Sequence, residues 1–147
     1  MTIEIKEIQA VETYPIRHIV LRPNQDISTC EYPGDEAPST FHLGAFKDGE
    51  VIGIASYYKE STPVFDKENQ YRLRGMATLP DYRGLQIGKQ LIIEAQALLK
   101  ERNADLWWCN ARTTASGFYE KLGLSVYGDV FEIDPIGPHK LMYFNLA

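Results

Sequence analysis

The segment from Tyr71 to Leu99 restricts the possible folds of this chain more than any other. Tyr71 to Leu79 is a strand candidate, and Pro80 ends it because proline cannot continue a central ladder. After a glycine-containing loop, apolar residues recur at helical spacing and predict an amphipathic helix. They are Ile87, Leu91, Ile92, Ala95, Leu98 and Leu99. Because Leu106 to Cys109 follows as another strand, the segment implies a parallel crossover and a mixed sheet.

Strands are also predicted before this segment. Ile3 and Ile5 alternate with polar residues and indicate a first strand, and a helix is expected from Pro15 to Arg22. The polar, turn-rich stretch 24–40 reads as a long loop, of the kind that often shapes a substrate site. The runs 41–46 and 51–58 flank Asp48-Gly49, a strong signal for a tight antiparallel hairpin.

The C-terminal third predicts a helix and two closing strands. The helix runs from about Thr113 to Leu122 and ends at Gly123. Residues 124–127 and 140–146 are strand-like, with a glycine- and proline-containing segment between them. The chain therefore alternates strands and helices throughout.

Composition limits the class of protein. With 147 residues, 44% of them hydrophobic, the chain fits one globular domain over residues 1–147. Its net charge of −5 offers no general attraction for nucleic acid or an anionic membrane. No signal peptide or membrane-spanning run is evident, so a cytoplasmic protein is expected.

The cysteines and histidines do not suggest a metal or thiol site. Cys30 and Cys109 match neither a metal clip nor a disulfide framework, and Cys109 reads as a buried small hydrophobe rather than a catalytic thiol. Three scattered histidines seldom make a metal site, so no metal is expected.

The loop between the strand ending at Thr78 and the helix starting near Gln86 is the strongest candidate for binding an anion. Such a loop aims free N–H groups and the positive end of the helix dipole at one point, which suits a phosphate. Gly84 and Gly88 allow close backbone approach, and Arg83 and Lys89 supply positive charge. The glycines could equally serve a turn and helix packing. A nucleotide-binding enzyme is disfavoured because the loop lacks a Gly-Lys-Ser/Thr ending.

Two motifs in this region resemble the GNAT superfamily of acetyl-CoA-dependent N-acetyltransferases. Arg83-Gly84-Leu85-Gln86-Ile87-Gly88 is similar to the family's Arg/Gln-x-x-Gly-x-Gly/Ala signature, with Gln86 where the middle glycine is usual. About thirty residues on, Ala115-Ser116-Gly117-Phe118-Tyr119-Glu120-Lys121-Leu122-Gly123-Leu124 is close to Ala-x-x-Phe-Tyr-x-Lys-x-Gly-Phe. Together these motifs cover roughly residues 71–127.

The resemblance implies a fold, an activity and a cofactor. The fold would be a single α/β (α+β) domain whose central sheet is mixed, mostly antiparallel and flanked by about four helices, with a splayed pair of parallel strands. The activity would be acetyl transfer from acetyl-CoA to an amine, by direct attack in a ternary complex. A small-molecule acceptor is preferred to a large protein, because no strongly acidic or basic face is evident. A homodimer is plausible, and no nucleic-acid or membrane partner is expected.

The resemblance also implies which residues hold the cofactor. The pantetheine arm would lie along Met76, Ala77 and Thr78, whose backbone would also supply the oxyanion donor, with residues 107–110 as the partner strand. Phe118 reads either as core or as packing on pantetheine, and either Asn110 or Arg112 would contact the cofactor. The full expected cofactor set is Met76, Ala77, Thr78, Arg83, Gly84, Leu85, Gln86, Ile87, Gly88, Lys89, Asn110, Arg112, Ser116 and Phe118.

Tyr119 matches the family tyrosine that protonates the leaving sulfur, a role open to a phenol because it stays protonated at neutral pH. The general base is not fixed by the resemblance, and Glu132 and His139 are the candidates because the closing hairpin borders the acceptor site. Three further residues, Arg17, His42 and Arg74, are candidates for recognising a carboxylate or other polar group on the acceptor. The alternative is a GNAT-like module that senses acyl-CoA without turnover, and the presence of Tyr119 argues against it.

Overall fold

The computed structural model describes residues 2–147, in which two compact units are distinguishable. Among the described residues, the first unit comprises 2–59 with Leu73–Leu98, and the second comprises Glu60–Arg72 with Leu99–Ala147. Each unit therefore combines two separate stretches of chain. That residues 1–147 act as one domain stays a prediction.

The strands follow the order β1-β2-β3-β4-β5-β7-β6 in a mixed sheet. β1 with β2, β2 with β3, β5 with β7 and β6 with β7 are antiparallel, whereas β4 with β5 is parallel. The parallel ladder runs from Gln70↔Leu106 to Arg72↔Trp108 and so covers only the first three residues of each strand. The mixed, mostly antiparallel sheet predicted from the sequence is confirmed. Its strands are β1 (Glu4–Ile8), β2 (Phe41–Lys47), β3 (Glu50–Lys59), β4 (Gln70–Thr78), β5 (Leu106–Arg112), β6 (Ser125–Ile133) and β7 (Gly137–Asn145).

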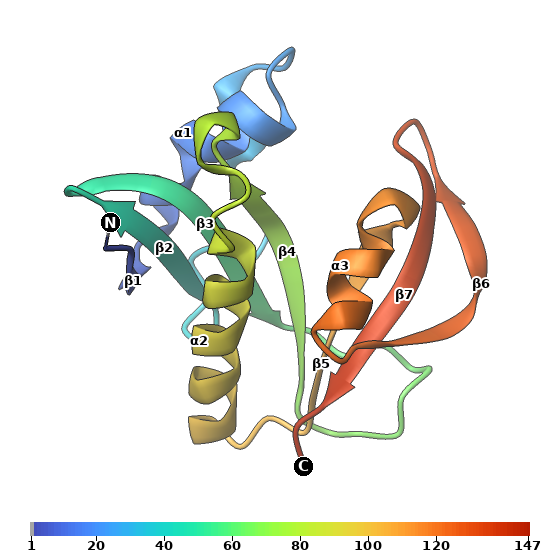
Figure 1. Ribbon diagram of the computed structural model, residues 1–147. Coiled ribbons are helices and arrows are strands. Elements are labelled where there is room, and N and C mark those ends of the chain that lie inside the picture. The colour runs from blue at the N-terminus through green and yellow to red at the C-terminus, as the bar shows by residue number, and fades with distance from the viewer. Residues whose placement is uncertain (1) are drawn as a thin grey trace. The chain divides into compact units, whose positions relative to one another are not determined.

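In the first unit, α1 (Tyr14–Ile16) and α2 (Ile87–Glu101) cover opposite faces of the strands (Figure 1). Ile87 packs so closely on Gly53 of β3 that an added Cβ there would lie 2.7 Å from Ile87 Cγ2. Ile54, the next residue of β3, instead clusters with Ile16. Because neighbouring side chains of a strand point to opposite faces, the two helices lie on opposite sides. Gly53 thus brings the N-terminus of α2 close to the strands.

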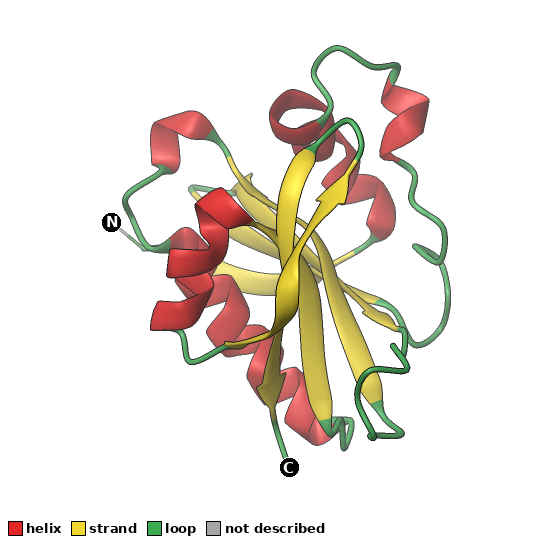
Figure 2. Ribbon diagram, turned by 90° about the vertical axis from the view of Figure 1, so that its right-hand side faces the viewer, coloured by secondary structure: helices red, strands yellow, loops and turns green. Residues whose placement is uncertain are grey.

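In the second unit, α3 (Ser116–Lys121) lies beside β7, and β6 and β7 form a hairpin that leads to the C-terminus (Figure 2). α3 ends in a turn at Gly123, which takes the left-handed φ of +96°. A Cβ on Gly123 would also lie 3.2 Å from the Phe144 ring. Glycine at this position therefore serves both the turn and the close approach of the chain to β7.

The sequence places most elements correctly, with differences at their ends. The expected helix from Pro15 to Arg22 consists of α1, which begins at Tyr14, and a π-helical turn (Arg17–Leu21), and a 3₁₀ turn (Ala10–Thr13) precedes it. The stretch 24–40 contains one 3₁₀ turn, Ile27–Cys30, and two further such turns are Pro80–Tyr82 and Thr113–Ala115. The closing strands are longer than expected, and β6 continues past a register shift between Tyr127 and Phe131, where Gly128 has a φ of +74°.

Within residues 2–147, no helix has the length and apolar character needed to cross a bilayer. The same residues contain no group of three or more histidines, cysteines or carboxylates placed to hold a metal ion.

Candidate functional site

The predicted anion-binding loop has two residues in the left-handed region. Gly84 has a φ of +85°, and an added Cβ there would meet nothing within 4 Å. Gln86 has a φ of +61°, so it keeps the backbone conformation for which glycine is usual. Both residues are exposed, as are Arg83 and Lys89 on either side of them. The loop is therefore an open backbone cradle flanked by two positive side chains.

The cradle leads directly into α2. The Gln86 carbonyl accepts a hydrogen bond from the Gln90 N–H at 3.1 Å, so Gln86 caps the helix with its backbone. Helix geometry leaves the N–H groups of Ile87, Gly88 and Lys89 without acceptors inside the helix, and the helix dipole adds partial positive charge there. A cradle of this kind suits the pyrophosphate of a nucleotide-like cofactor.

Gln86→Gly is expected to leave the protein as stable or up to about 1 kcal/mol more stable, since relief of the left-handed strain exceeds the extra chain entropy of glycine. The dissociation constant of CoA, the cofactor expected from the sequence, should stay within roughly threefold, because the expected contacts are made by backbone groups. Gln86→Val is the opposing variant. A β-branched residue resists positive φ, so it should cost about 2 kcal/mol and weaken CoA binding. Urea unfolding and calorimetry measure both effects, and weaker CoA binding by Gln86→Gly would instead assign a contact to the Gln86 side chain.

A second special backbone position lies in β4, just before the predicted pantetheine strand. Gly75 has a φ of +66°, and a Cβ there would lie 3.2 Å from Tyr32 Cε2 and 3.5 Å from Arg17 Nε. Of the residues that follow, Ala77 is buried, and Met76 and Thr78 are half-buried. The chain therefore bends in β4 beside Arg17 and Tyr32, and only glycine fits the bend.

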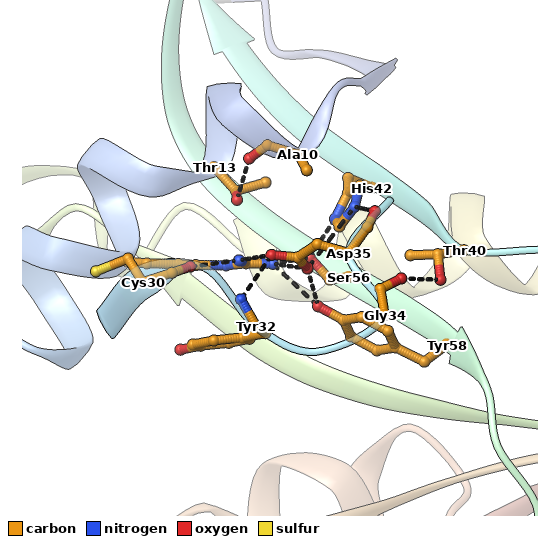
Figure 3. Close-up of polar contacts among 11 residues, drawn as sticks. Ala10, Thr13, Cys30, Tyr32, Gly34, Asp35, Thr40, His42, Ser56 and Tyr58 are labelled. Carbon is orange, nitrogen blue, oxygen red and sulfur yellow. Dashed lines mark hydrogen bonds and ion pairs between the residues drawn. The ribbon is translucent and has the colours of Figure 1, made fainter. Parts of the chain in front are cut away.

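Arg17 is fully buried in a polar network of the first unit. Its partners Asp35, Ser56 and Tyr58 are labelled in Figure 3. Its guanidinium donates to both carboxylate oxygens of Asp35, at 2.7 and 3.1 Å. It also donates to the Cys30 carbonyl at 2.7 Å, Ser56 Oγ at 2.9 Å and Tyr58 Oη at 3.1 Å. The Tyr58 hydroxyl in turn donates to Asp35 at 2.5 Å. Every Nη position of Arg17 is thus engaged inside the protein.

His42 belongs to the same network, and Figure 3 shows its ring turned toward Ser56 and Asp35. Its Nε2 lies 3.0 Å from the Asp35 carbonyl, and its Nδ1 lies 2.7 Å from Ser56 Oγ. Because a carbonyl only accepts, Nε2 carries a proton, and in the neutral imidazole Nδ1 then accepts from the serine hydroxyl. Both ring nitrogens are therefore occupied. The structure brings Arg17 and His42 together, but in a closed network rather than with free groups.

In the second unit, Tyr119 of α3 is close enough to Cys109 of β5 for the two groups to interact electrostatically. Both side chains are buried, at 8% and 3% exposure. Burial, with a smaller contribution from Cys109, raises the pKa of the Tyr119 phenol well above its usual value. Burial likewise raises the pKa of the Cys109 thiol to about 12, against a smaller opposing effect of Arg72. Both groups stay protonated at neutral pH, so Cys109 is a buried hydrophobe, as predicted.

The two predicted bases lie on opposite faces of the closing hairpin. His139 of β7 is directly opposite Phe131 of β6, with ring centroids 6.1 Å apart, whereas Glu132 is opposite Pro138. Cross-strand partners share a face, and adjacent residues alternate. His139 is buried and donates from Nδ1 to the Gly137 carbonyl at 2.8 Å, an arrangement that in the neutral imidazole leaves Nε2 with a lone pair. Glu132 is exposed.

The remaining predicted cofactor residues of the second unit lie around the end of β5 and the start of α3. Asn110 is half-buried, and Arg112 is exposed and directly opposite His139 in the ladder. Ser116 is buried and donates its hydroxyl to the Thr113 carbonyl at 2.9 Å. Phe118 is 37% exposed, so it is not a core residue. Its ring meets Tyr119 edge-on at 5.0 Å.

Sequence reasoning did not find the partners of Arg17. Tyr32 and Asp35 come from the polar stretch expected to be a loop near the substrate, and Ser56 and Tyr58 lie in β3. Only one signal pointed to them, namely a polar residue and a tyrosine at alternate positions of an otherwise apolar strand.

Comparison with known proteins agrees with the two motifs. The model of the acetyltransferase (GNAT) family matches residues 4–124, most of the chain. A relative from Bacillus subtilis strain 168, called "Uncharacterized N-acetyltransferase YitI", is 46% identical over 144 residues, covering 98% of this chain and 97% of its own.

Solved structures show the same fold at low sequence identity. An aminoglycoside 6′-N-acetyltransferase complexed with coenzyme A superposes with a TM-score of 0.79 at 14% identity, covering 98% of this chain and 97% of its own. Ard1 from Thermoplasma volcanium superposes with a TM-score of 0.80 at 18% identity, covering 100% and 99%.

Proposed function

The chain belongs to the acetyltransferase (GNAT) family, and from this premise we propose that it transfers an acetyl group from acetyl-CoA to a small-molecule amine by direct attack in a ternary complex. The observation that carries the proposal is the Tyr119 phenol. It is buried, it stays protonated because its pKa is raised, and its hydroxyl has no hydrogen-bond partner among residues 2–147. A protonated phenol held in this way is suited to donate to a leaving thiolate.

The cofactor would be held by groups from both motifs. The open cradle of residues 83–89 would bind the pyrophosphate through backbone N–H groups, and an added Cβ at Gly84 meets nothing that would block it. The parallel ladder ends at Arg72↔Trp108, before Met76, Ala77 and Thr78, so the pantetheine arm would pair there as an added strand does. Asn110, Arg112, Ser116 and the exposed ring of Phe118 would complete the contacts.

The candidate acid and base belong to opposite faces of β5 and β7. His139 lies directly opposite Arg112 in the ladder of β5 and β7. Tyr119 is close to Cys109, which precedes Arg112 by three residues in β5, so the Cys109 side chain points to the other face of the strand. When bound, acetyl-CoA supplies a thioester whose carbonyl carbon the acceptor amine attacks. We propose that His139 takes the proton from the amine and that Tyr119 gives one to the sulfur. Direct transfer needs no covalent enzyme intermediate, which agrees with the protonated state of Cys109.

His139→Gln is expected to lower kcat by about 10²-fold, because the lone pair at Nε2 is lost while an amide can still bond to the Gly137 carbonyl. The KM for acetyl-CoA should not change. Glu132→Gln is the competing variant, and steady-state kinetics with both separates the two candidates. A loss of kcat with Glu132→Gln alone would assign the base to Glu132.

Release of free thiol from acetyl-CoA tests the function directly. The panel should include amino acids, polyamines, peptides and, because one structural neighbour carries that name, aminoglycosides. CoA binding is measured beside it by calorimetry. Thiol release that depends on an amine supports the enzyme. Tight CoA binding without release for any amine would favour the alternative, a sensor of acyl-CoA, and absence of CoA binding would refute both.

A further inference from the structure

The aromatic ring of Tyr32 is surrounded by guanidinium groups. Those of Arg17, Arg74 and Arg22 lie 4.1, 4.9 and 5.2 Å from its centroid, respectively. Arg17 lies in the π-helical turn, Arg22 directly follows that turn, and Arg74 lies in β4. Tyr32 itself is buried, and its N–H is fixed by a bond to Asp35 Oδ2 at 2.8 Å. The ring is thus a rigid platform that holds three cations together.

Only one of these three cations has a carboxylate partner among residues 2–147. Arg17 is paired with Asp35, whereas neither Arg22 nor Arg74 has a carboxylate within 4.0 Å among residues 2–147. Arg22 donates to the neutral Gln25 side chain at 3.2 Å, and Arg74 has the Tyr32 ring as its partner.

Acidic side chains are present in the neighbourhood, but they form no ion pair with Arg22 or Arg74 among residues 2–147. Glu31 and Glu36, together with Asp35, contribute to raising the pKa of Tyr14 after the effect of its burial. Neither of the two glutamates makes an ion pair with Arg22 or Arg74. Both arginines are half-buried, so water screens them less than it would on an open surface. An anion placed between them would relieve their mutual repulsion.

Arg74 also has a defined place relative to the chemistry. It directly precedes Gly75, where β4 bends, and Met76–Thr78, where the pantetheine arm is proposed to lie. In a strand successive residues advance by about 3.3 Å, so a group bound at Arg74 lies close to the proposed position of the acyl end. The cradle for the pyrophosphate begins only at Arg83, beyond the end of the strand. Arg74 is therefore placed for the acceptor rather than for the cofactor.

We propose that Arg74 and Arg22, held on Tyr32, bind an anionic group of the acceptor, so that the substrate is a short amine carrying a carboxylate or a phosphate. This inference rests on the proposed function and deepens it. Arg17 does not bind the acceptor, since its Nη groups are engaged by Asp35, Ser56 and Tyr58. Arg17 instead positions Tyr32. A guanidinium suits either anion because it offers two parallel N–H groups.

Matched acceptor pairs test the proposal. Amino acids are compared with their primary amides, and phosphoethanolamine with ethanolamine, in the thiol-release assay. We expect kcat/KM to be at least tenfold higher for the anionic member of one pair, and the pair that responds identifies the anion. Equal kcat/KM within every pair that is turned over would overturn the proposal.

Arg74→Gln should lower kcat/KM for the anionic acceptor by about 10- to 100-fold, mainly through KM, and leave the neutral one unchanged. Arg74→Lys should recover part of the loss. Arg72→Gln is the matched control, because Arg72 also lies in β4 over an aromatic ring, Trp108 at 5.1 Å, but is paired with Glu60 at 3.0 Å. Thermal unfolding checks that each variant is folded. Equal losses for both acceptors would contradict the assignment.

A binding measurement separates failure of this inference from failure of the proposed function. CoA-saturated protein is titrated with N-acetylglycine and with N-acetylglycinamide, without turnover. Tighter binding of the anion, lost in Arg74→Gln, would support the site even if no amine were acetylated, whereas equal affinity would refute it. Weaker binding of CoA itself by Arg74→Gln would assign the cluster to the cofactor and also refute the proposal.

Discussion

Tyr119→Phe is expected to lower kcat by about 10²-fold or more while the dissociation constant of CoA stays the same. The phenol is buried with its hydroxyl unbonded among residues 2–147, and phenylalanine keeps the ring and its edge-on contact with Phe118 at 5.0 Å. The substitution therefore removes a proton donor and little else. Steady-state kinetics and calorimetry with CoA measure the two quantities separately.

The protonation state of Tyr119 adds a second expectation. Because burial raises the pKa of the phenol, the group stays protonated across the alkaline range in which an ordinary tyrosine would ionise. Any fall of kcat at alkaline pH in the wild type should then persist in Tyr119→Phe. Tyr127→Phe is the matched control, since Tyr127 is 46% exposed and in the same unit, and its kcat should equal that of the wild type. Equal kcat for Tyr119→Phe and the wild type would rule out the acid role.

The sequence predicts those parts of the protein that depend on local periodicity. α2 has the apolar stripe that buries Ile87, Leu91 and Leu99, and Pro80 ends β4 as expected. Gln86 shows where this reasoning reaches its limit. Its side chain suggests an altered cradle, yet its φ of +61° shows that the backbone conformation is retained. A sequence pattern reports the residue type, whereas the proposed phosphate site would depend on the backbone.

The polar network around Arg17 could not be predicted, because its contacts join residues far apart in the chain. Arg17 bonds to Asp35, Ser56 and Tyr58, which follow it by 18, 39 and 41 residues. No periodicity relates these positions. From the sequence, Arg17 is a candidate for recognising a carboxylate or other polar group on the acceptor. Its complete burial changes that interpretation, since a buried charge requires partners within the protein.

Asp35→Asn is expected to destabilise the protein by about 3–5 kcal/mol, because it leaves the Arg17 charge buried without a counterion. That is a large part of the roughly 5–15 kcal/mol by which a domain is stable. Glu60→Gln is the matched control. Glu60 pairs with Arg72 at a similar distance, 3.0 Å, but its side chain is 45% exposed, so the loss should be about 1 kcal/mol or less. Urea unfolding at pH 7 measures both.

The pH dependence of the stability lost in Asp35→Asn identifies the cause of that loss. Burial alone would raise the pKa of Asp35, but hydrogen bonds from Arg17, Tyr58 and the Tyr32 N–H outweigh it and hold the pKa below its usual value. The carboxylate therefore stabilises the fold above the unfolded-state pKa of about 4, and this contribution is lost as pH falls through the lower folded-state pKa. The difference in the free energy of unfolding between the wild type and Asp35→Asn should therefore become smaller at acidic pH. Adding Arg17→Met to Asp35→Asn should restore stability, because it removes the uncompensated charge; a further loss would mean that the Arg17 hydrogen bonds matter more than its charge.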